Sequence, residues 1–387
     1  MQAVLMAAGK STRTYPLTLE RPKPLLPLVG KTLLERNLDE MVGLVDEVVI
    51  VVGYRADMIR DEMGEEYRGI KVTYAEQREQ LGTGHAVLQA RPFIRGPFLA
   101  LNGDDLYQRV DLERLAKYDY AALVREVPDP SLYGVCKTDA EGRIVDLIEK
   151  PKTFVGNLAN VGCYKLQPEF FDVLENTPLS ERGEIEITSA VVAVAQMRPF
   201  FVVEMKGYWL PTGYAWDLLK HARFLLEKGY NVGETVHGKL DGVQVEPPAY
   251  VAAGAKVDPG AVIGPYTVVE SGARIERNAV VRESLVFGGA VVREDARVYA
   301  SVLGSDVLLQ ARALLAHEPL EGGNVVSVAK GKPVDTGLAR LGAVVGDRAV
   351  IGAGATLSPG VKIWPGEKVG HGKAVSRDLM WPGFVWS

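Results

Sequence analysis

The stretch Val345–Val375 reads VGDRAVIGAGATLSPGVKIWPGEKVGHGKAV, and an aliphatic residue returns in it at every sixth position. Neither the 3.6-residue period of a helix nor the two-residue period of a strand explains this spacing. A six-residue repeat is typical of a solenoid in which three short strands make one triangular coil. The aliphatic side chains then point inward, and small residues such as Ala349 and Ala355 fit the tight corners.

The same rhythm extends back along the chain to Val251. It runs without a break from Val251 to Val281, continues at Val292 and Val298, and resumes after a slip at Val302. About sixteen repeats can be counted, which resembles the hexapeptide-repeat left-handed β-helix. An ordinary β-sandwich is the alternative, but it would not hold this period over such a length. We therefore predict a left-handed parallel β-helix domain over residues 247–387.

Residues 316–340 interrupt the repeat with glycines, lysines and a proline. A loop that leaves a solenoid between coils is usually functional or disordered, so we predict an insertion there.

The first 230 residues have a different texture, in which short apolar runs alternate with amphipathic stretches. This βαβα order predicts a Rossmann-like α/β domain with a mostly parallel sheet and helices on both faces. Ligands of such sheets bind beyond the carboxyl ends of the strands. We expect residues 231–246 to be a linker. The expected strands are Val4–Ala8, Glu47–Val52, Lys71–Tyr74, Phe98–Asn102 and Tyr120–Val124, and the expected helices are Leu33–Val42, Arg55–Met63, Gly84–Ala90, Leu112–Lys117 and Gly213–Lys228.

Composition excludes several classes of partner. The formal net charge of −5 argues against nucleic acid as the main partner. No stretch approaches the roughly 20 apolar residues of a membrane span, and the N-terminal MQAVLMAAGK is too short for a signal segment and is interpreted as a buried strand. Both cysteines, Cys136 and Cys163, lie in apolar runs, so we expect reduced thiols and a cytoplasmic protein.

Two neighbouring motifs indicate that the chain handles polyphosphate. The first strand ends in Ala7-Ala8-Gly9-Lys10-Ser11-Thr12-Arg13, and Arg21-Pro22-Lys23-Pro24 follows shortly afterwards. A turn of small residues after a strand lets backbone N–H groups approach phosphate oxygens. Arg13 and Lys23 can neutralise a triphosphate, and the flanking prolines limit where the ammonium group of Lys23 can reach.

The segment Met6–Pro27 resembles the signature of the sugar-1-phosphate nucleotidylyltransferases, which reads roughly as an L-A-G turn, G-x-G-T-R, P-L-T and R-P-K-P-L-x-P. The resemblance is strongest to the archaeal and bacterial bifunctional type, which carries a C-terminal left-handed β-helix. It implies transfer of a nucleotidyl group from UTP or dTTP to glucose 1-phosphate or N-acetylglucosamine 1-phosphate, with release of pyrophosphate. Arg13 and Lys23 would be catalytic. Ala7, Ala8, Gly9 and Ser11 would bind the nucleotide.

One position of this turn departs from the family signature. Ser11 replaces its second glycine. We expect Ser11 to adopt a permitted φ or to donate its hydroxyl to a phosphate.

The same resemblance assigns the base and the metal. Gln77 and the backbone at Gly82 would recognise uracil or thymine, with Thr83 beside them, and His85 would cap or pack the next helix. An amide suits a pyrimidine edge because it offers a donor and an acceptor. Asp104, at the end of a strong apolar strand, would bind Mg²⁺, with Asp105 as a weaker candidate.

The second metal carboxylate of the family motif W-x-D-x-G is missing. Pro211 stands at that position in Trp209–Gly213. Mg²⁺ would then rest on Asp104, the triphosphate and water, and Asp217 is a candidate substitute.

The sugar side follows in the same way. Gly134 would allow close approach of the sugar, Glu149 would accept hydrogen bonds from its hydroxyls, Lys150 would hold its phosphate and Asn160 would contact it. The attacking phosphate is already an anion, so the reaction needs alignment and charge neutralisation rather than a general base.

Two alternatives stay open. Pro211 fits a non-catalytic regulatory subunit that only binds a nucleotide sugar. The β-helix raises the possibility of acetyl transfer to an amino sugar, for which relatives use a histidine and a tyrosine that are not evident here. His317, at the entrance of the insertion, is the remaining candidate, with Lys330 and Lys332 in the loop. Left-handed β-helices of this family commonly pack as trimers, so we expect a homo-oligomer.

Overall fold

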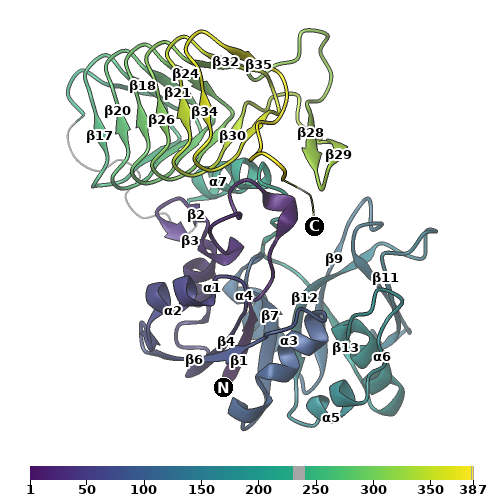
Figure 1. Cartoon of the computed structure of the whole chain (residues 1–387). Coiled ribbons are helices and arrows are strands. Elements are labelled where there is room, and N and C mark those ends of the chain that lie inside the picture. Colours follow the sequence, from purple (N-terminus) through teal and green to yellow (C-terminus); the bar gives the residue numbers. More distant parts are fainter. Residues whose placement is uncertain (230–239, 385, 387) are drawn as a thin grey trace. The chain divides into compact units, whose positions relative to one another are not determined.

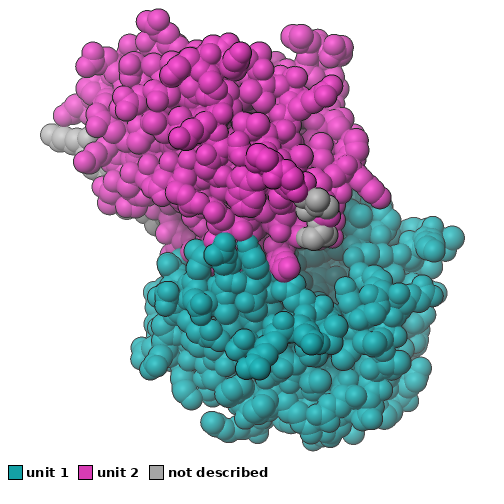
Figure 2. Space-filling model, viewed as in Figure 1, with its two compact units in different colours: residues 1–9, 33–211 teal, residues 10–32, 212–387 magenta. Residues whose placement is uncertain are grey.

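The computed structural model describes residues 1–229, 240–384 and 386. Contacts divide the chain into two compact units, coloured separately in Figure 2. The first, the α/β unit, comprises residues 1–9 and 33–211, and the second, the β-helix unit, comprises residues 10–32 and 212–387. The predicted linker 231–246 falls largely outside the described residues. The domain boundary near residue 230 stays a prediction.

The α/β unit is built on one mixed sheet with the strand order β11-β10-β12-β7-β1-β4-β6-β5. Strand β9 also pairs with β12, and β13 pairs with β9. Its centre, β7-β1-β4-β6, is entirely parallel. Its strands, together with the short ribbon β8–β14, are β1 (Gln2–Met6), β4 (Glu47–Val52), β5 (Glu66–Tyr67), β6 (Ile70–Glu76), β7 (Phe98–Asn102), β8 (Leu106–Tyr107), β9 (Ala121–Glu126), β10 (Gly134–Thr138), β11 (Ile144–Glu149), β12 (Leu158–Leu166), β13 (Phe201–Glu204) and β14 (Trp209–Leu210).

Helices cover both faces of this sheet, as predicted (Figure 1). Strands β1, β4 and β7 are almost continuous apolar runs because both of their faces are buried, whereas β6 alternates between buried and more exposed residues. On one face, α3, α5 and α6 pack against residues such as Val4, Val49 and Phe98. The helices of the unit are α1 (Leu33–Met41), α2 (Ala56–Met63), α3 (Thr83–Gln89), α4 (Arg109–Leu115), α5 (Phe170–Glu175) and α6 (Ile187–Met197).

The second unit contains the left-handed β-helix as three parallel sheets. The first is β15 (Gln244–Val245), β18 (Val262–Ile263), β21 (Val280–Arg282), β24 (Arg297–Tyr299), β27 (Leu314–Leu315), β32 (Thr356–Leu357) and β35 (Ala374–Val375). The second is β16 (Ala249–Val251), β19 (Thr267–Val269), β22 (Leu285–Val286), β25 (Val302–Leu303), β30 (Val344–Val345) and β33 (Lys362–Ile363). The third is β17 (Lys256–Val257), β20 (Arg274–Ile275), β23 (Val291–Val292), β26 (Leu308–Leu309), β31 (Val350–Ile351) and β34 (Lys368–Val369).

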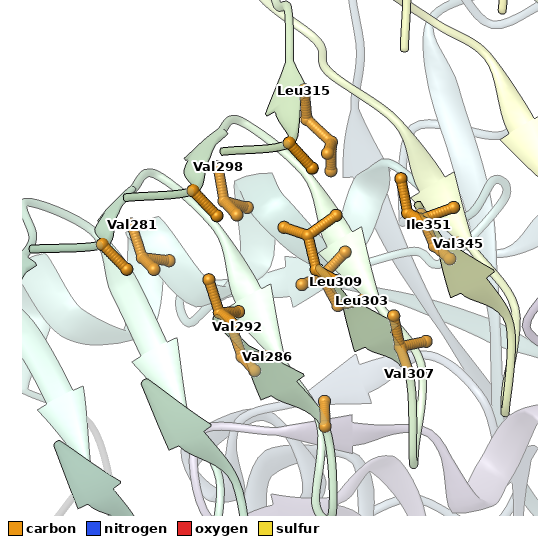
Figure 3. Packing of buried hydrophobic residues seen from close by; sticks show 14 of the residues in the cluster. Val281, Val286, Val292, Val298, Leu303, Val307, Leu309, Leu315, Val345 and Ile351 are labelled. Atoms are coloured by element: carbon orange, nitrogen blue, oxygen red, sulfur yellow. The ribbon is translucent and has the colours of Figure 1, made fainter. Parts of the chain in front are cut away.

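The predicted aliphatic repeat forms the core of this β-helix. Figure 3 shows side chains of successive coils stacked inside it, for example Val281, Val298 and Leu315 along one sheet. Small residues such as Ala349 and Ala355 are fully buried at the corners. The described residues form more short β-helix strands than the roughly sixteen repeats counted in the sequence. Strands such as β22 also form where the six-residue period slips. Within the predicted insertion, β28 (Val326–Ala329) and β29 (Lys332–Asp335) pair as an antiparallel hairpin.

Residues 10–32 and α7 (Asp217–Lys228) belong to the same unit as the β-helix. Between residues 10 and 32 the described structure is limited to two 3₁₀ turns, η1 (Thr12–Thr14) and η2 (Lys23–Leu25), and a small ribbon, β2 (Pro27–Leu28) with β3 (Lys31–Thr32). The outward side chains of the second β-helix sheet are buried, among them Val268, Leu285, Val302 and Val344. Side chains on both faces of this sheet are therefore buried.

Candidate functional site

Four adjacent parallel strands end at one edge of the α/β unit, and each is followed by a residue that the sequence singled out or by a glycine. Ala7–Gly9 follow β1, Gly53 follows β4, Gln77 follows β6 and Asp104 lies just beyond β7. Since the sheet order is β7-β1-β4-β6, these residues lie side by side along the edge where α/β sheets bind ligands.

Backbone hydrogen bonds hold the turn after β1 close to its neighbours. The N–H of Ala7 donates to Val51 O at 2.9 Å, and the N–H of Tyr54 donates to Ala8 O at 3.0 Å. A β-carbon on Gly53 would lie 2.9 Å from Ala8 O, so this position excludes larger residues. Ala7 and Ala8 are buried, whereas Gly9 is exposed. The turn therefore presents its backbone to solvent only from Gly9 onward.

The side chain of Gln77 is buried and fixed from within the α/β unit. Its Nε2 donates to Gly82 O at 3.1 Å and to Nδ1 of His85 at 3.0 Å. Both amide hydrogens are thus used, and His85 acts as an acceptor rather than as a reacting group. The amide oxygen, Oε1, is the group of Gln77 left to meet a ligand. The sequence predicts that Gln77 offers both a donor and an acceptor. In the described structure its donor group is bound within the unit, and the acceptor remains.

Gly82 precedes α3 as its N-cap, in a conformation that favours glycine, with φ of 101°. A β-carbon there would lie 2.7 Å from Ile185 O. The hydroxyl of Thr83 accepts a hydrogen bond from the N–H of Ile187 at 3.4 Å, so Thr83 ties the start of α3 to α6. Gln80, between Gln77 and Gly82, donates from Nε2 to Ala8 O at 2.9 Å. Residues 77–82 are therefore joined directly to the turn after β1.

Asp104 and Asp105 have different surroundings. Asp105 is buried and its Oδ2 accepts a hydrogen bond from Asn102 Nδ2 at 3.2 Å, whereas Asp104 is half-buried. Asp104 is therefore the more accessible carboxylate. No group of three or more His, Cys, Asp or Glu side chains that could hold a metal occurs among the described residues.

The position of the missing second carboxylate can be read from the β8–β14 ribbon. Leu210 pairs with Leu106 in antiparallel register, which places Pro211 opposite Asp105 at the end of the ribbon. A carboxylate at 211 would thus have stood beside Asp104 and Asp105.

Asp217, the candidate substitute, is committed elsewhere. Its Oδ2 accepts hydrogen bonds from the N–H groups of Gly213 and Tyr214 at 3.0 and 2.8 Å, and its Oδ1 lies 3.5 Å from Lys220 Nζ. Burial raises the pKa of Asp217, which the lysine and the backbone donors oppose. These bonds also explain why α7 begins at Asp217 and not at the predicted Gly213. These bonds occupy Asp217, and its suggested role as a substitute metal ligand stays a prediction.

Three of the four predicted sugar residues lie in one row across adjacent strands. Gly134 at the start of β10 pairs with Glu149 on β11 and with Asn160 on β12. A β-carbon on Gly134 would lie 2.9 Å from Glu149 Oε2, which explains the glycine. The Asn160 side chain is held by Tyr164, whose hydroxyl accepts a hydrogen bond from Nδ2 at 2.6 Å, and by the N–H of Gly162, which donates to Oδ1 at 3.3 Å.

Lys150 adjoins this row, and a second cation lies there that the sequence analysis did not identify. Lys150 Nζ is 3.7 Å and Arg182 Nη2 is 3.9 Å from Glu149 Oε1. Burial raises the pKa of Glu149, and the two cations oppose that shift. Arg182 comes from a loop that carries no motif, so only the fold reveals it.

The β-helix unit holds the two predicted catalytic cations. Ser11 has φ of 52°, in the left-handed region, as its place in a glycine position predicts. Its carbonyl oxygen accepts hydrogen bonds from the hydroxyls of Thr14 at 2.6 Å and Thr18 at 2.9 Å. The guanidinium of exposed Arg13 lies 5.7 Å from the ring centroid of Tyr214, while Lys23 is buried in turn η2.

His317 has a neighbour that the repeat pattern did not reveal. Its ring centroid is 4.9 Å from that of Tyr299, which lies one coil earlier. Nε2 of His317 lies 3.7 Å from Glu318 Oε1. Burial lowers the pKa of His317, Glu318 opposes this shift and Arg340 adds to it.

Two further observations bear on the remaining predictions. Cys136 and Cys163 are both buried free thiols, and burial raises the pKa of each. No helix among the described residues has the length and apolar composition to cross a membrane.

Comparison with known proteins identifies the family of this chain. The family described as Nucleotidyl transferase matches residues 2–228, and the family described as GMPPB C-terminal domain matches residues 245–336. The bifunctional protein GlmU of Methanococcus maripaludis is 32% identical over 368 residues, which cover 90% of this chain and 88% of that protein. UTP–glucose-1-phosphate uridylyltransferase AglF of Haloferax volcanii is 38% identical over 226 residues, which are 56% of this chain and 93% of that protein.

A solved structure of UDP-glucose pyrophosphorylase complexed with UDP-glucose aligns with a TM-score of 0.54 at 27% identity, over 59% of this chain and 98% of that one. The similarity to sugar-1-phosphate nucleotidylyltransferases predicted from Met6–Pro27 is thereby confirmed. The chain belongs to the nucleotidyl transferase family, among enzymes that act on sugar 1-phosphates.

Proposed function

We propose that this chain transfers the nucleotidyl group of UTP or dTTP to glucose 1-phosphate or N-acetylglucosamine 1-phosphate and releases pyrophosphate. The observation that supports this most is the order of residues along the carboxyl edge of β7-β1-β4-β6. A metal-binding carboxylate, a phosphate turn and a base-reading amide follow one another at Asp104, Ala7–Gly9 and Gln77. That is the order in which the phosphates and the base of a nucleoside triphosphate would lie.

The surroundings of Gln77 favour uracil and thymine. Because both hydrogens of Nε2 are bound internally, Oε1 meets the base as an acceptor. Uracil and thymine carry a donor at N3–H, whereas N3 of cytosine is an acceptor. The N–H of Gly82 donates no hydrogen bond among the described residues, so it is free to bind a pyrimidine carbonyl. This pair of contacts selects UTP or dTTP over CTP.

The row of Gly134, Glu149 and Asn160 supports a sugar site. Glu149 accepts hydrogen bonds from sugar hydroxyls, and Lys150 and Arg182 supply positive charge for the phosphate that the sugar carries.

The chemistry is an in-line displacement at phosphorus. A phosphate oxygen of the sugar 1-phosphate forms a bond to the α-phosphorus, and the bond between that phosphorus and the oxygen of the leaving pyrophosphate breaks. Arg13 neutralises the leaving pyrophosphate, and Lys23 reduces the repulsion between the α-phosphate and the incoming anion. The turn at Ala7–Ser11 aligns the triphosphate. No side chain needs to take a proton.

The residues present fit a Mg²⁺ ion. Mg²⁺ keeps several waters and binds through one or two carboxylates plus substrate phosphates. Asp104 supplies one accessible carboxylate, and Pro211 supplies none. When bound, the ion would neutralise phosphate charge.

The test measures pyrophosphate release with Mg²⁺ for a panel of substrates. The nucleotides include UTP, dTTP and CTP, and the sugars include glucose 1-phosphate and N-acetylglucosamine 1-phosphate. We expect turnover with UTP or dTTP and little with CTP. Absence of turnover with every pair, together with tight binding of a UDP-sugar, would instead establish the regulatory role that Pro211 raises.

Acyl transfer to an amino sugar is a second candidate, favoured by the Tyr299–His317 pair. A histidine whose pKa is lowered by burial is neutral near pH 7 and can accept a proton from an amine. Thiol release from acetyl-CoA in the presence of glucosamine 1-phosphate tests it. The signal should vanish in His317→Ala, and no signal in the unaltered chain dismisses this activity.

We also propose a homo-oligomer, such as a trimer, that forms through the first or third β-helix sheet. The outward side chains of the second sheet are buried, whereas half-buried aliphatic residues such as Val280, Leu314 and Leu308 point outward on the other two. Two free cysteines are consistent with a reducing cytoplasm. Sedimentation of the intact chain measures the oligomer.

A further inference from the structure

Arg21 joins residues 10–32 to the coils of the β-helix. Its Nη2 donates to Ser305 Oγ at 2.8 Å and lies 3.1 Å from Asp347 Oδ2. The guanidinium carbon also lies 5.9 Å from the ring centroid of Phe287. These partners are far away in the sequence, yet all belong to the same compact unit as residues 10–32.

The three partners come from equivalent corners of successive coils. Phe287 follows β22, Ser305 lies two residues beyond β25, and Asp347 lies two residues beyond β30, and these strands are neighbours in the second β-helix sheet. Stacking of the coils therefore brings an aromatic ring, a hydroxyl and a carboxylate together along one edge.

The carboxylate of Asp347 is itself fixed. Its Oδ1 accepts a hydrogen bond from the N–H of Ser305 at 2.8 Å. A β-carbon on Gly304 would lie 2.5 Å from the same oxygen, so the glycine is needed for the carboxylate to lie against the neighbouring coil.

The ion pair is largely withdrawn from water. The side chains of Arg21 and Asp347 are 15% and 9% exposed. An exposed pair contributes little, but removing one partner of a buried pair leaves an uncompensated charge and is costly. Next to it, Arg348 pairs with Glu20, so two consecutive residues of the segment are paired with two consecutive residues of one coil.

Little slack separates Arg21 from Lys23. Only Pro22 intervenes, and its φ of −69° is set by its ring. The carbonyl of Pro22 then accepts a hydrogen bond from the N–H of Leu25 at 3.0 Å, within the turn that carries Lys23. A shift of Arg21 is therefore transmitted to the backbone of Lys23.

We propose that Asp347, supported by Ser305, is a positioning residue for nucleotidyl transfer, which holds Lys23 in place through Arg21 and Pro22. The β-helix thereby takes part in the catalytic step of this chain. AglF and the UDP-glucose pyrophosphorylase structure each align over nearly their whole length with little more than half of this chain. The proposal rests on the proposed function only for its kinetic readout.

The experiment compares Asp347→Ala with Asp258→Ala in the full chain. Asp258 also pairs with an arginine of the β-helix, Arg274, at 3.0 Å, but it makes no bond to residues 10–32 in the described structure. We expect Asp347→Ala to lower kcat for pyrophosphate release at least about ten-fold, because a displacement on the order of 1 Å can cost a hundred-fold. KM for the sugar 1-phosphate should change little. Asp258→Ala should leave both unchanged.

Two further readouts separate positioning from general damage. Hydrogen exchange of the amides between residues 14 and 26 should speed up in Asp347→Ala and not in Asp258→Ala. Arg21→Ala should match Asp347→Ala, and the double variant should be no slower than either, because both act through one contact. Asp347→Asn keeps one of the two acceptor oxygens that Arg21 and the N–H of Ser305 use, and should recover part of the rate.

Each outcome decides the proposal. Wild-type kcat and exchange in a folded Asp347→Ala would overturn it, and so would fully additive effects of Arg21→Ala and Asp347→Ala. If Asp347→Ala does not fold, Ser305→Ala and Asp347→Asn replace it, with the same expected exchange and a smaller loss of kcat; unaltered values in both overturn the proposal. If the unaltered chain releases no pyrophosphate, the proposed function fails, and the exchange measurement still decides whether Asp347 holds the segment.

Discussion

Gln77 and Asp104 follow strands of the parallel sheet. Arg13 and Lys23 instead lie in residues 10–32, where the structure describes two 3₁₀ turns and the short ribbon of β2 and β3. Hydrogen bonds between neighbouring strands and their loops fix the first pair, for example from the N–H of Gln77 to Val52 O at 2.8 Å. The segment that carries Arg13 and Lys23 contacts residues that are distant in the sequence. Arg13 lies beside Tyr214, and Arg21 lies beside Asp347.

The residues proposed for recognition and those proposed for chemistry therefore have different structural supports. The residues proposed to read the base and the sugar lie on the sheet, which suits precise recognition. The cations proposed to act on the phosphates lie in residues 10–32, which belong to the same unit as the β-helix. Changes in the sheet should therefore alter selectivity, while changes in the segment or its supports should alter the rate.

The largest expected effect comes from Lys23→Ala. Loss of a cation that stabilises charge in the transition state should lower kcat by about 10²–10³, with the melting temperature of the β-helix nearly unchanged. Pyrophosphate release measures the rate, and Lys256→Ala, an exposed lysine of the β-helix, is the control. Near-normal turnover in Lys23→Ala would reject its role.

Gln77→Ala should chiefly affect selectivity. Removing the acceptor for N3–H should lower kcat/KM for UTP by about 10–100-fold and reduce the preference for UTP over CTP. His85→Ala serves as the control for disturbance of the buried pair, because it leaves Oε1 of Gln77 in place. An unchanged ratio of UTP to CTP turnover in Gln77→Ala would show that the base binds elsewhere.

Pro211→Asp should restore a second carboxylate opposite Asp105. Because added carboxylates strengthen Mg²⁺ binding, the Mg²⁺ concentration for half-maximal turnover should fall a few-fold. A magnesium titration of pyrophosphate release measures this, with Pro211→Asn as the uncharged control. Equal requirements in both variants would argue that position 211 does not face the metal.

The smallest expected effect concerns pH and the β-helix alone. Burial lowers the pKa of Lys362 to about 8, against 10.5 for an ordinary lysine. Between these values the unfolded chain binds more protons than the folded one, so the free energy of unfolding should rise as pH increases through this window. Below about pH 8 the buried charge costs its full amount.

Lys362→Met should therefore raise stability at pH 7 by roughly 1–3 kcal/mol, since one pKa unit corresponds to about 1.4 kcal/mol. It should also remove the rise between pH 8 and 10. Thermal melts over this range measure the effect, with exposed Lys368→Met as the control. The same pH slope in Lys362→Met and the unaltered chain would contradict the assignment.

Much of this organisation can be predicted from the sequence, because its determinants are local and periodic. The six-residue rhythm predicts the β-helix core, and apolar runs predict β4 and β7 with the observed bounds. The row of Gly134, Glu149 and Asn160 follows from family motifs on strands that the fold brings together.

The supports of the site could not be predicted, because they depend on which distant segments pack together. Arg182 and Tyr214 belong to no motif and reach their places through loops. Asp347 looks like any corner residue of a hexapeptide repeat, and only the coil stacking places it beside Ser305 and Arg21. The hydrogen bonds from the N–H groups of Gly213 and Tyr214 to Asp217 likewise could not be predicted from the sequence.

The most direct test of the central claim is a crystal structure of the full chain with UTP and Mg²⁺. We predict that the triphosphate lies against the backbone of residues 7–13. The side chains of Arg13 and Lys23 should be directed at phosphate oxygens, and the uracil N3–H should donate to Gln77 Oε1. A nucleotide bound away from this turn, or Arg13 and Lys23 directed into solvent in the complex, would contradict it.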